Sequence, residues 1–149
     1  HEGCVERLTS RVNELKIQDK VTFMGVLEWS RAMKEIAEGT IGLCLLMPLP
    51  NNLILLSTKI IEYMMLGIPV LASNFDTWKP YVEGERIGMM ADPTNVDEIA
   101  DVCEKMLSDK EELVAMGKRG MEAVRTKYNW DSEFKVLLQC YNDLLDQKK

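Results

Sequence analysis

Four residues near the middle of the chain carry the groups that a nucleotide diphosphate needs from a protein. Ser57, Thr58 and Lys59 offer two hydroxyls and an ammonium, and Glu62 follows three positions after the lysine. If this segment is helical, Lys59 and Glu62 lie on one face, one turn apart. The start of a helix binds phosphate through its free N–H groups, and a carboxylate can accept two hydrogen bonds from a ribose diol.

The position of Lys59 is unusual for a lysine. A helix carries partial positive charge at its start, so a lysine there costs a few tenths of a kcal/mol unless an anion binds beside it. The alternative interpretation is an ion pair between Lys59 and Glu62 on the surface, which contributes about 0.2–0.5 kcal/mol. Both interpretations stay open from these residues alone.

The local pattern predicts a helix followed by a buried strand. Ser57 and Thr58 are good N-cap residues, residues 59–66 form the predicted helix, and Gly67 is suited to end it in a left-handed conformation. Residues 68–72 are a short apolar run between turn residues, which is typical of a strand buried on both faces. The segment therefore indicates an α/β fold.

The same segment carries a family motif. Residues 57–73 read Ser-Thr-Lys-x-x-Glu-Tyr-Met-x-x-Gly-x-Pro-Val-x-Ala-Ser, which resembles the donor-site segment of the group 1 glycosyltransferases, the family-4 type with the GT-B fold. Residues 21–25, 41–48, 88–93 and 128–130 resemble other parts of that family in the same order. The resemblance covers nearly the whole chain, so it is far more specific than any one motif.

The resemblance implies roles for individual residues. Ser57, Thr58 and Lys59 would bind the diphosphate of a UDP- or GDP-sugar, and Glu62 would bind its ribose. The backbone around Phe23, Met24 and Gly25 would form the edge of the base pocket, or these residues are simply the end of a strand. Pro50, Asn51 and Asn52 follow the carboxyl end of a predicted strand, where α/β sheets bind ligands, so this loop either lines the donor sugar or is a plain connection. The resemblance implies neither a cofactor nor a metal ion, and no Asp-x-Asp motif occurs that could anchor a divalent cation.

One position departs from the family pattern. The family often carries two glutamates eight positions apart, the second on the ribose and the first near the transferred sugar. Glu62 matches the second, and the position of the first is occupied by Ile54. We therefore assign no catalytic residue in this chain from its sequence.

Composition limits the classes of partner. The chain has 149 residues, enough for one domain over residues 1–149, and a net charge of −6. Negative charge argues against binding to nucleic acid or to an anionic membrane. No apolar run is long enough to span a membrane. The four cysteines show no Cys-x-x-Cys spacing, which favours free thiols and a cytoplasmic location.

Strands and helices are predicted to alternate along the whole chain. The pattern indicates a Rossmann-like parallel sheet with helices on both faces. The predicted strands cover residues 21–24, 41–47, 68–72 and 87–91, a loop covers 48–52, and helices include residues 4–15, 29–37 and 59–66. Three further helices are predicted to start with caps at Asn95, Ser108 and Asn129, the last with an apolar stripe that is partly exposed.

The resemblance also implies missing parts. The C-terminal domain of a GT-B enzyme begins with two strands that have no counterpart here, so we expect a sheet truncated at its N-terminal side. Unpaired strand edges recruit partners, which predicts unusual packing or a homodimer through these edges. The acceptor glycan, lipid or small molecule would bind an absent N-terminal domain, so the chain alone is expected to be inactive.

Two other functions fit the sequence. One is a nucleotide-sugar epimerase of GT-B architecture, although such enzymes use acid–base histidines and this chain has a single histidine, His1. The other is a non-catalytic module that binds a nucleotide sugar or a protein, an interpretation that rests on Ile54. Activity of the longer protein would distinguish the three.

Overall fold

The computed structural model describes residues 2–146, so His1 lies outside the described residues. The chain forms two compact units, His1–Ala32 and Met33–Lys149. The prediction of a single domain over residues 1–149 stays a prediction.

The first unit contains helix α1 (Glu2–Glu14) and an irregular segment that leads to helix α2 (Trp29–Ala37), which crosses the boundary between the units. The helix predicted at residues 4–15 is therefore present. The strand predicted at residues 21–24 is wrong, because these residues have no regular structure. A parallel strand forms only against a neighbour that pairs with its backbone groups, and the described residues include no partner for this segment.

The second unit is built on a parallel sheet of three strands. β1 (Gly42–Cys44), β2 (Val70–Ser73) and β3 (Gly88–Ala91) lie in the order β1-β2-β3. β2 pairs with β1 from Val70 opposite Gly42, and with β3 from Val70 opposite Gly88. The predicted parallel arrangement is confirmed, and among the described residues β1 and β3 each pair with β2 alone.

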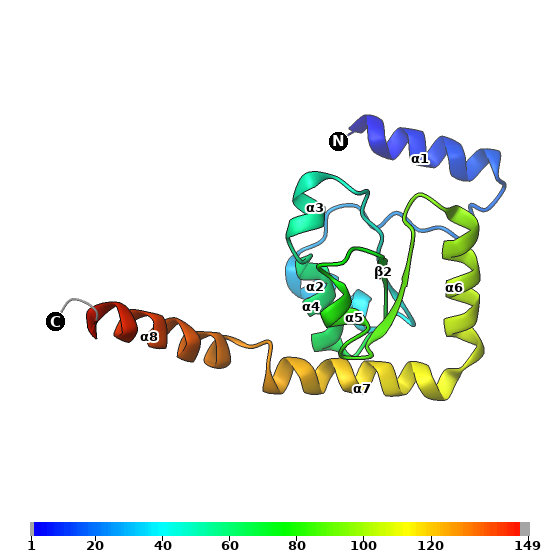
Figure 1. Cartoon of the computed structure of the whole chain (residues 1–149). Coiled ribbons are helices and arrows are strands. Elements are labelled where there is room, and N and C mark those ends of the chain that lie inside the picture. Colours follow the sequence, from blue (N-terminus) through cyan, green and yellow to red (C-terminus); the bar gives the residue numbers. More distant parts are fainter. Residues whose placement is uncertain (1, 147–149) are drawn as a thin grey trace. The chain divides into compact units, whose positions relative to one another are not determined.

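Side chains of the central strand alternate between two cores. Val70 and Ala72 pack with Ile60 and Met64 of helix α4 (Thr58–Leu66), while Leu71 packs on the other side with Met106. Figure 1 shows α4 and α5 (Lys79–Val82) on one side of β2 and α6 (Val96–Ser108) on the other. Helices on both faces, as predicted, explain why all four residues of β2 are buried.

β1 is shorter than the sequence predicts. The apolar run over residues 41–47 predicts a central strand, but only Gly42–Cys44 form one. Leu43 at its centre is 52% exposed, whereas Cys44 is buried. The run is apolar enough for a central strand, but β1 pairs on one side only, and an edge strand has fewer ladder hydrogen bonds to extend it.

Caps define where the later helices begin. The Asn95 side chain accepts from the Glu98 N–H and starts α6, and Asn129 accepts from the Ser132 N–H at the start of α8 (Trp130–Asp146), as predicted. Helix α7 (Lys110–Thr126) starts one residue later than predicted. The Asp109 carboxylate, rather than Ser108, accepts from the Glu112 N–H, because a carboxylate is a stronger acceptor in this position.

The last helix has no buried residue. Its apolar stripe is exposed, as the sequence predicts, and includes Phe134, Leu137, Leu138, Tyr141, Leu144 and Leu145. Within residues 2–146, no helix is both long enough and apolar enough to cross a membrane.

Candidate functional site

The start of helix α4 is open. Ser57 occupies the N-cap position with extended backbone angles, φ −70° and ψ 130°, but its side chain makes no capping hydrogen bond. Among residues 2–146, no partner is bonded to the backbone N–H groups of Thr58 or Lys59. These donors stay available to an anion, which is the property that makes a helix start a phosphate site. The helix ends at Gly67 in a left-handed conformation, φ 72°, as predicted.

Lys59 and Glu62 lie on this helix as predicted, one turn apart. Lys59 is exposed and Glu62 is partly buried, while Ile60 between them is fully buried and fixes which face of the helix points outward. No hydrogen bond or ion pair joins Lys59 or Glu62 to another described residue. The alternative of a Lys59–Glu62 surface pair is therefore not formed, and both charged groups are free to bind a ligand.

A buried thiol lies behind the start of α4. Cys44, the last residue of β1, is 1% exposed, and burial raises the pKa of its thiol. A hydrogen bond from the Ser57 hydroxyl and the charge of Lys59 act in the opposite direction on this pKa. The end of β1 and the start of α4 are therefore close enough for Ser57 and Lys59 to act on the Cys44 thiol, and the Ser57 side chain does not cap its own helix.

Tyr63 fixes helix α4 against the edge strand. Its hydroxyl donates to the Leu43 carbonyl at 3.2 Å, and its ring packs on Gly42, where an added Cβ would come within 2.6 Å of ring carbons. Burial, followed by nearby Cys44 and Glu62, raises the pKa of Tyr63, which keeps the hydroxyl protonated as a donor. These contacts determine how α4 presents Lys59 and Glu62.

Ser73 anchors the segment that follows β1. The side chain of Ser73 is fully buried, and its hydroxyl donates to the Leu46 carbonyl and accepts from the Leu46 N–H, both at 2.8 Å. A Ser hydroxyl can donate and accept at once, so it replaces the ladder bonds that β1 lacks at this point. The carboxyl ends of β1 and β2 are thereby held together beside the start of α4.

The predicted sugar loop is in fact a short helix. Pro50, Asn51 and Asn52 open helix α3 (Pro50–Ile54), so the prediction of a loop over residues 48–52 is wrong in its second half. Pro50 is at the first helical position, where its fixed φ favours a helix and its missing N–H costs nothing. The side-chain amide of Asn52 donates to the Met47 carbonyl at 2.9 Å and closes the turn before the helix.

The segment after β2 holds α3 in place. The Thr77 hydroxyl donates to the Leu53 carbonyl, and the indole N–H of buried Trp78 donates to the Leu55 carbonyl, each at 2.9 Å. Ile54, at the position where the family often has its first glutamate, is 72% exposed between these two anchored residues. The backbone there is fixed and the side chain is apolar.

The candidate base-pocket residues belong to the first unit. Phe23 and Met24 are 45% and 43% exposed, and Gly25 has a left-handed conformation with φ +66°. They lie in irregular backbone rather than at the end of a strand. Within the second unit, by contrast, Ser57, Thr58, Lys59 and Glu62 all lie in the first turns of one helix. Their binding roles remain predictions.

Residues that shape this site were not singled out by the sequence patterns. Ser73 ends an apolar strand, and a polar residue in a fully buried run is a signal for a structural hydrogen bond. Thr77 and Trp78 lie in a segment rich in turn residues, so their bonds to α3 could not be read from periodicity.

No cluster of metal-binding side chains is found among residues 2–146: nowhere do three or more His, Cys, Asp or Glu side chains come together as a metal ion would require. The candidate site itself offers a lysine and a helix start near one glutamate.

Comparison with known proteins identifies the family. The sequence profile described as "Glycosyl transferases group 1" matches residues 3–123. The chain belongs to the group 1 glycosyl transferases. The family resemblance found in the sequence is therefore confirmed, and the donor-site motif lies within the matched region.

Similar proteins include two mannosyltransferases. The chain is 33% identical over 72 residues to the GDP-mannose-dependent alpha-(1-6)-phosphatidylinositol monomannoside mannosyltransferase of Mycobacterium tuberculosis, over 48% of this chain and 19% of that protein. It is 42% identical over 71 residues to the alpha-1,3/1,6-mannosyltransferase alg-2 of Neurospora crassa, over 46% of this chain and 15% of that protein. The chain thus matches less than a fifth of the length of either glycosyl transferase.

A solved structure matches the fold of this group 1 glycosyl transferase chain. The structure of sucrose-phosphate synthase from Thermosynechococcus elongatus superposes with a TM-score of 0.80 and 24% identity, over 95% of this chain and 34% of the other. This likeness confirms the predicted GT-B type of α/β fold.

Proposed function

We propose that this chain is the donor-nucleotide half of an enzyme that transfers a sugar from a nucleotide diphosphate sugar to an acceptor. One observation carries the proposal: the open start of α4, with Lys59 and Glu62 unpaired on one face of the helix. Membership of the group 1 glycosyl transferases supports it, because the motif that holds these residues lies within the matched region.

The geometry suits the charge that develops in such a reaction. The bond between the sugar and the diphosphate breaks, the acceptor oxygen bonds to the sugar and loses its proton, and the nucleoside diphosphate departs with its negative charge. The Lys59 ammonium and the free N–H groups of Thr58 and Lys59 would stabilise that charge. The Glu62 carboxylate would hold the ribose. We assign no proton-transferring residue to this chain.

We propose GDP as the first nucleotide to test. One similar protein is named as GDP-mannose-dependent and another is a mannosyltransferase, which supports a GDP-linked hexose over the other donors. The acceptor, a glycan, a lipid or a small molecule, would bind residues outside this chain, because the chain corresponds to a minor part of its relatives. Transfer would need no cofactor and no divalent metal.

Two further properties are proposed on physical grounds. Cys4, Cys44, Cys103 and Cys140 are all free thiols, which supports a reducing, cytoplasmic location. The outer edges of β1 and β3 have no strand partner among the described residues, and such edges support pairing with a second copy.

The experiment is a product analysis on the longer protein that contains this chain, supplied with GDP-mannose or UDP-glucose and an acceptor extract. A transferase releases the nucleoside diphosphate and labels the acceptor. An epimerase changes the sugar and leaves the acceptor unlabelled, and a binding module does neither. The known relatives do not favour the epimerase.

Lys59→Ala should lower the transfer rate by about 100-fold, the effect of removing one group that stabilises a developing anion. Lys118→Ala, an exposed lysine on α7, is the matched control and should leave the rate unchanged. Equal rates for both variants would contradict the proposed role of Lys59.

A further inference from the structure

A pocket opens on the second unit away from the candidate donor site. Its volume is about 340 Å³, within the range of about 300–1,000 Å³ that small-molecule sites occupy. Thr40 lies just before β1, and Gly67 and Pro69 lie just before β2, so the pocket is at the amino ends of the strands. The start of α4 lies after the carboxyl end of β1 in the chain. Gly67, Ile68 and Pro69 belong to the later part of the donor-site motif, but none of its candidate binding residues, Ser57, Thr58, Lys59 and Glu62, lines the pocket.

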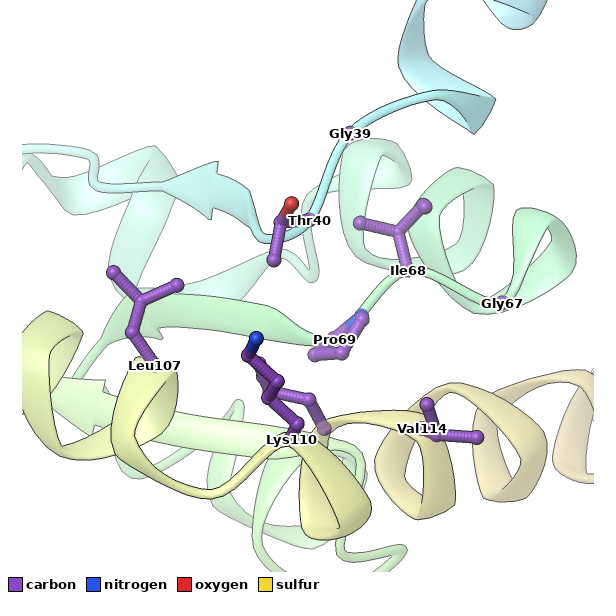
Figure 2. Close-up of a pocket in the computed structure, with 9 residues that line it drawn as sticks. Gly39, Thr40, Gly67, Ile68, Pro69, Leu107, Lys110 and Val114 are labelled. Carbon is purple, nitrogen blue, oxygen red and sulfur yellow. The ribbon is translucent and has the colours of Figure 1, made fainter.

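The walls of the pocket are mostly apolar. Ile68 and Leu113 are 6% and 7% exposed and form its inner side, while Leu107 and Val114 are 47% and 58% exposed. Figure 2 shows the side chains of Ile68, Leu107 and Val114 around one space, with Leu107 from the end of α6 and Val114 from α7. Such walls suit the apolar part of a small ligand, which gains about 25 cal/mol for each Å² removed from water.

One lining residue is charged. Lys110 is the first residue of α7, and Figure 2 shows its side chain rising from that helix toward Pro69 and Thr40. Within residues 2–146, Lys110 has no hydrogen-bond or ion-pair partner. Asp109 beside it does not line the pocket, and its carboxylate is bonded to the Glu112 N–H at 2.9 Å.

The position of Lys110 also favours an anion. The start of a helix carries partial positive charge, and an ammonium in the first turn adds to it. The first turn also carries Glu111 and Glu112, and Asp109 caps the helix, but none of these carboxylates lines the pocket. An anionic group bound in the pocket would therefore face the Lys110 ammonium. The pocket thus combines an apolar interior with one positively charged point.

We propose that this pocket binds a free small molecule with an apolar body and a single carboxylate, which contacts the Lys110 ammonium. The net charge of −6 disfavours a membrane or nucleic acid as the source of the anionic group. The volume fits one small ligand rather than a protein segment. This inference does not depend on the proposed sugar transfer, and either can fail without the other.

The test uses octanoate and its neutral analogue octanamide as probes with this chain. Methyl NMR spectra should show saturable shifts at Ile68, Leu107, Leu113 and Val114 on addition of octanoate. Octanamide should bind about fivefold more weakly or worse, because it cannot form the charged contact. The candidate site at the start of α4 should show no shifts.

Two variants separate the role of the charge from that of folding. Lys110→Met keeps the length of the side chain and should weaken octanoate binding about fivefold, with no effect on octanamide. Lys118→Met, on the same helix but outside the pocket, should bind octanoate as the parent chain does. The proposal is overturned if octanoate gives no saturable shifts at the pocket methyls, or if both variants bind octanoate equally.

Discussion

Ser73 connects the ends of two strands through a single buried hydroxyl. It bonds both backbone groups of Leu46 at 2.8 Å, and no other residue of β2 has a polar side chain. The segment that leads from β1 toward α3 therefore depends on this side chain. Removal of a buried hydroxyl that both donates and accepts a hydrogen bond is costly, because its two backbone partners stay buried without a hydrogen bond.

We predict that Ser73→Ala destabilises the chain by about 1–3 kcal/mol, the cost of leaving buried backbone groups without partners. Urea unfolding measures the change. Ser108→Ala is the control, since the exposed Ser108 hydroxyl bonds only the Lys105 carbonyl at the end of α6, and it should change stability by less than about 0.5 kcal/mol. A similar loss in both variants would contradict the anchoring role of Ser73.

Glu85 gives the chain a pH-dependent contact. Its carboxylate accepts from Lys127 Nζ at 2.8 and 3.0 Å and from the Tyr128 hydroxyl at 2.8 Å. The hydrogen bond from Lys127, together with one from Tyr128, lowers the pKa of Glu85. The Glu85 side chain is 18% exposed. Burial and the Glu85 hydrogen bond raise the pKa of Tyr128 to about 12.

The pKa of Glu85 determines the direction of the effect. The pKa of Glu85 is lower in the folded chain than in the unfolded chain. The contact therefore stabilises the folded chain fully above about pH 4.3, the ordinary pKa of a glutamate, and this stabilisation is lost as the pH falls through the pKa of Glu85 in the folded chain. Glu85→Gln should therefore lower stability by about 1–2 kcal/mol at pH 7 and should flatten the decline of stability in acid. Urea midpoints between pH 3 and 7 check this, and parallel profiles for both chains would contradict it.

At the residue scale, the sequence located the candidate donor groups but not their supports. Ser57, Thr58, Lys59 and Glu62 follow from local spacing, and the structure has them at the start of one helix. The contacts of Ser73 with Leu46 join residues 27 positions apart. No local pattern reports such a pairing, because it depends on which strands are neighbours.

At the element scale, α4 is held between the sheet and α7. Gly117 of α7 lies so close to the end of α4 that a Cβ on it would come within 2.1 Å of the Gly67 carbonyl oxygen. Tyr63 fixes the other side of α4 against β1. The position of the helix that carries Lys59 is therefore set by close backbone contact on one side and by an aromatic ring on the other.

We predict that Gly117→Ala destabilises the chain by about 1–3 kcal/mol through overpacking, although alanine is the better helix former. Thermal unfolding measures the loss. Gly3→Ala in α1 is the control, because nothing lies within 4 Å of the added Cβ, and its midpoint should not fall. An unchanged midpoint in Gly117→Ala would mean that α7 can move away from α4.

The sequence predicted most elements and missed those that depend on neighbours. Helix starts at Asn95 and Asn129 are set by local caps and were predicted correctly. The strand expected at residues 21–24 and the full length of the strand at 41–47 were wrong, because a strand forms only where its edge is paired. Helix α3 was predicted as a loop, since Pro and Asn are common in both.

At the scale of the whole molecule, the second unit exposes a stripe of apolar side chains along α8. Six apolar residues on this helix are between 43% and 63% exposed, and none of its residues is buried. Exposed contiguous apolar surface of this kind favours association. We therefore expect the isolated chain to self-associate through α8.

Replacement of Leu138 and Leu145 by Glu should shift the chain toward the monomer, because it puts two charges into the apolar stripe of α8. Light scattering coupled to size-exclusion chromatography measures the mass. Glu replacing Gln139 and Asn142, polar residues on the same helix, is the control for added charge and should leave the mass unchanged. Equal masses for all three chains would show that α8 does not mediate association.

The most direct test of the donor-site account is a thermodynamic cycle by calorimetric titration of GDP, GMP and 2′,3′-dideoxy-GDP. The parent chain should prefer GDP over both analogues. Lys59→Ala should reduce the preference for GDP over GMP about tenfold. Glu62→Ala should reduce the preference for GDP over 2′,3′-dideoxy-GDP about tenfold, and each change corresponds to roughly 1.4 kcal/mol. If both variants discriminate among the three nucleotides as the parent does, Lys59 and Glu62 do not bind the diphosphate and ribose.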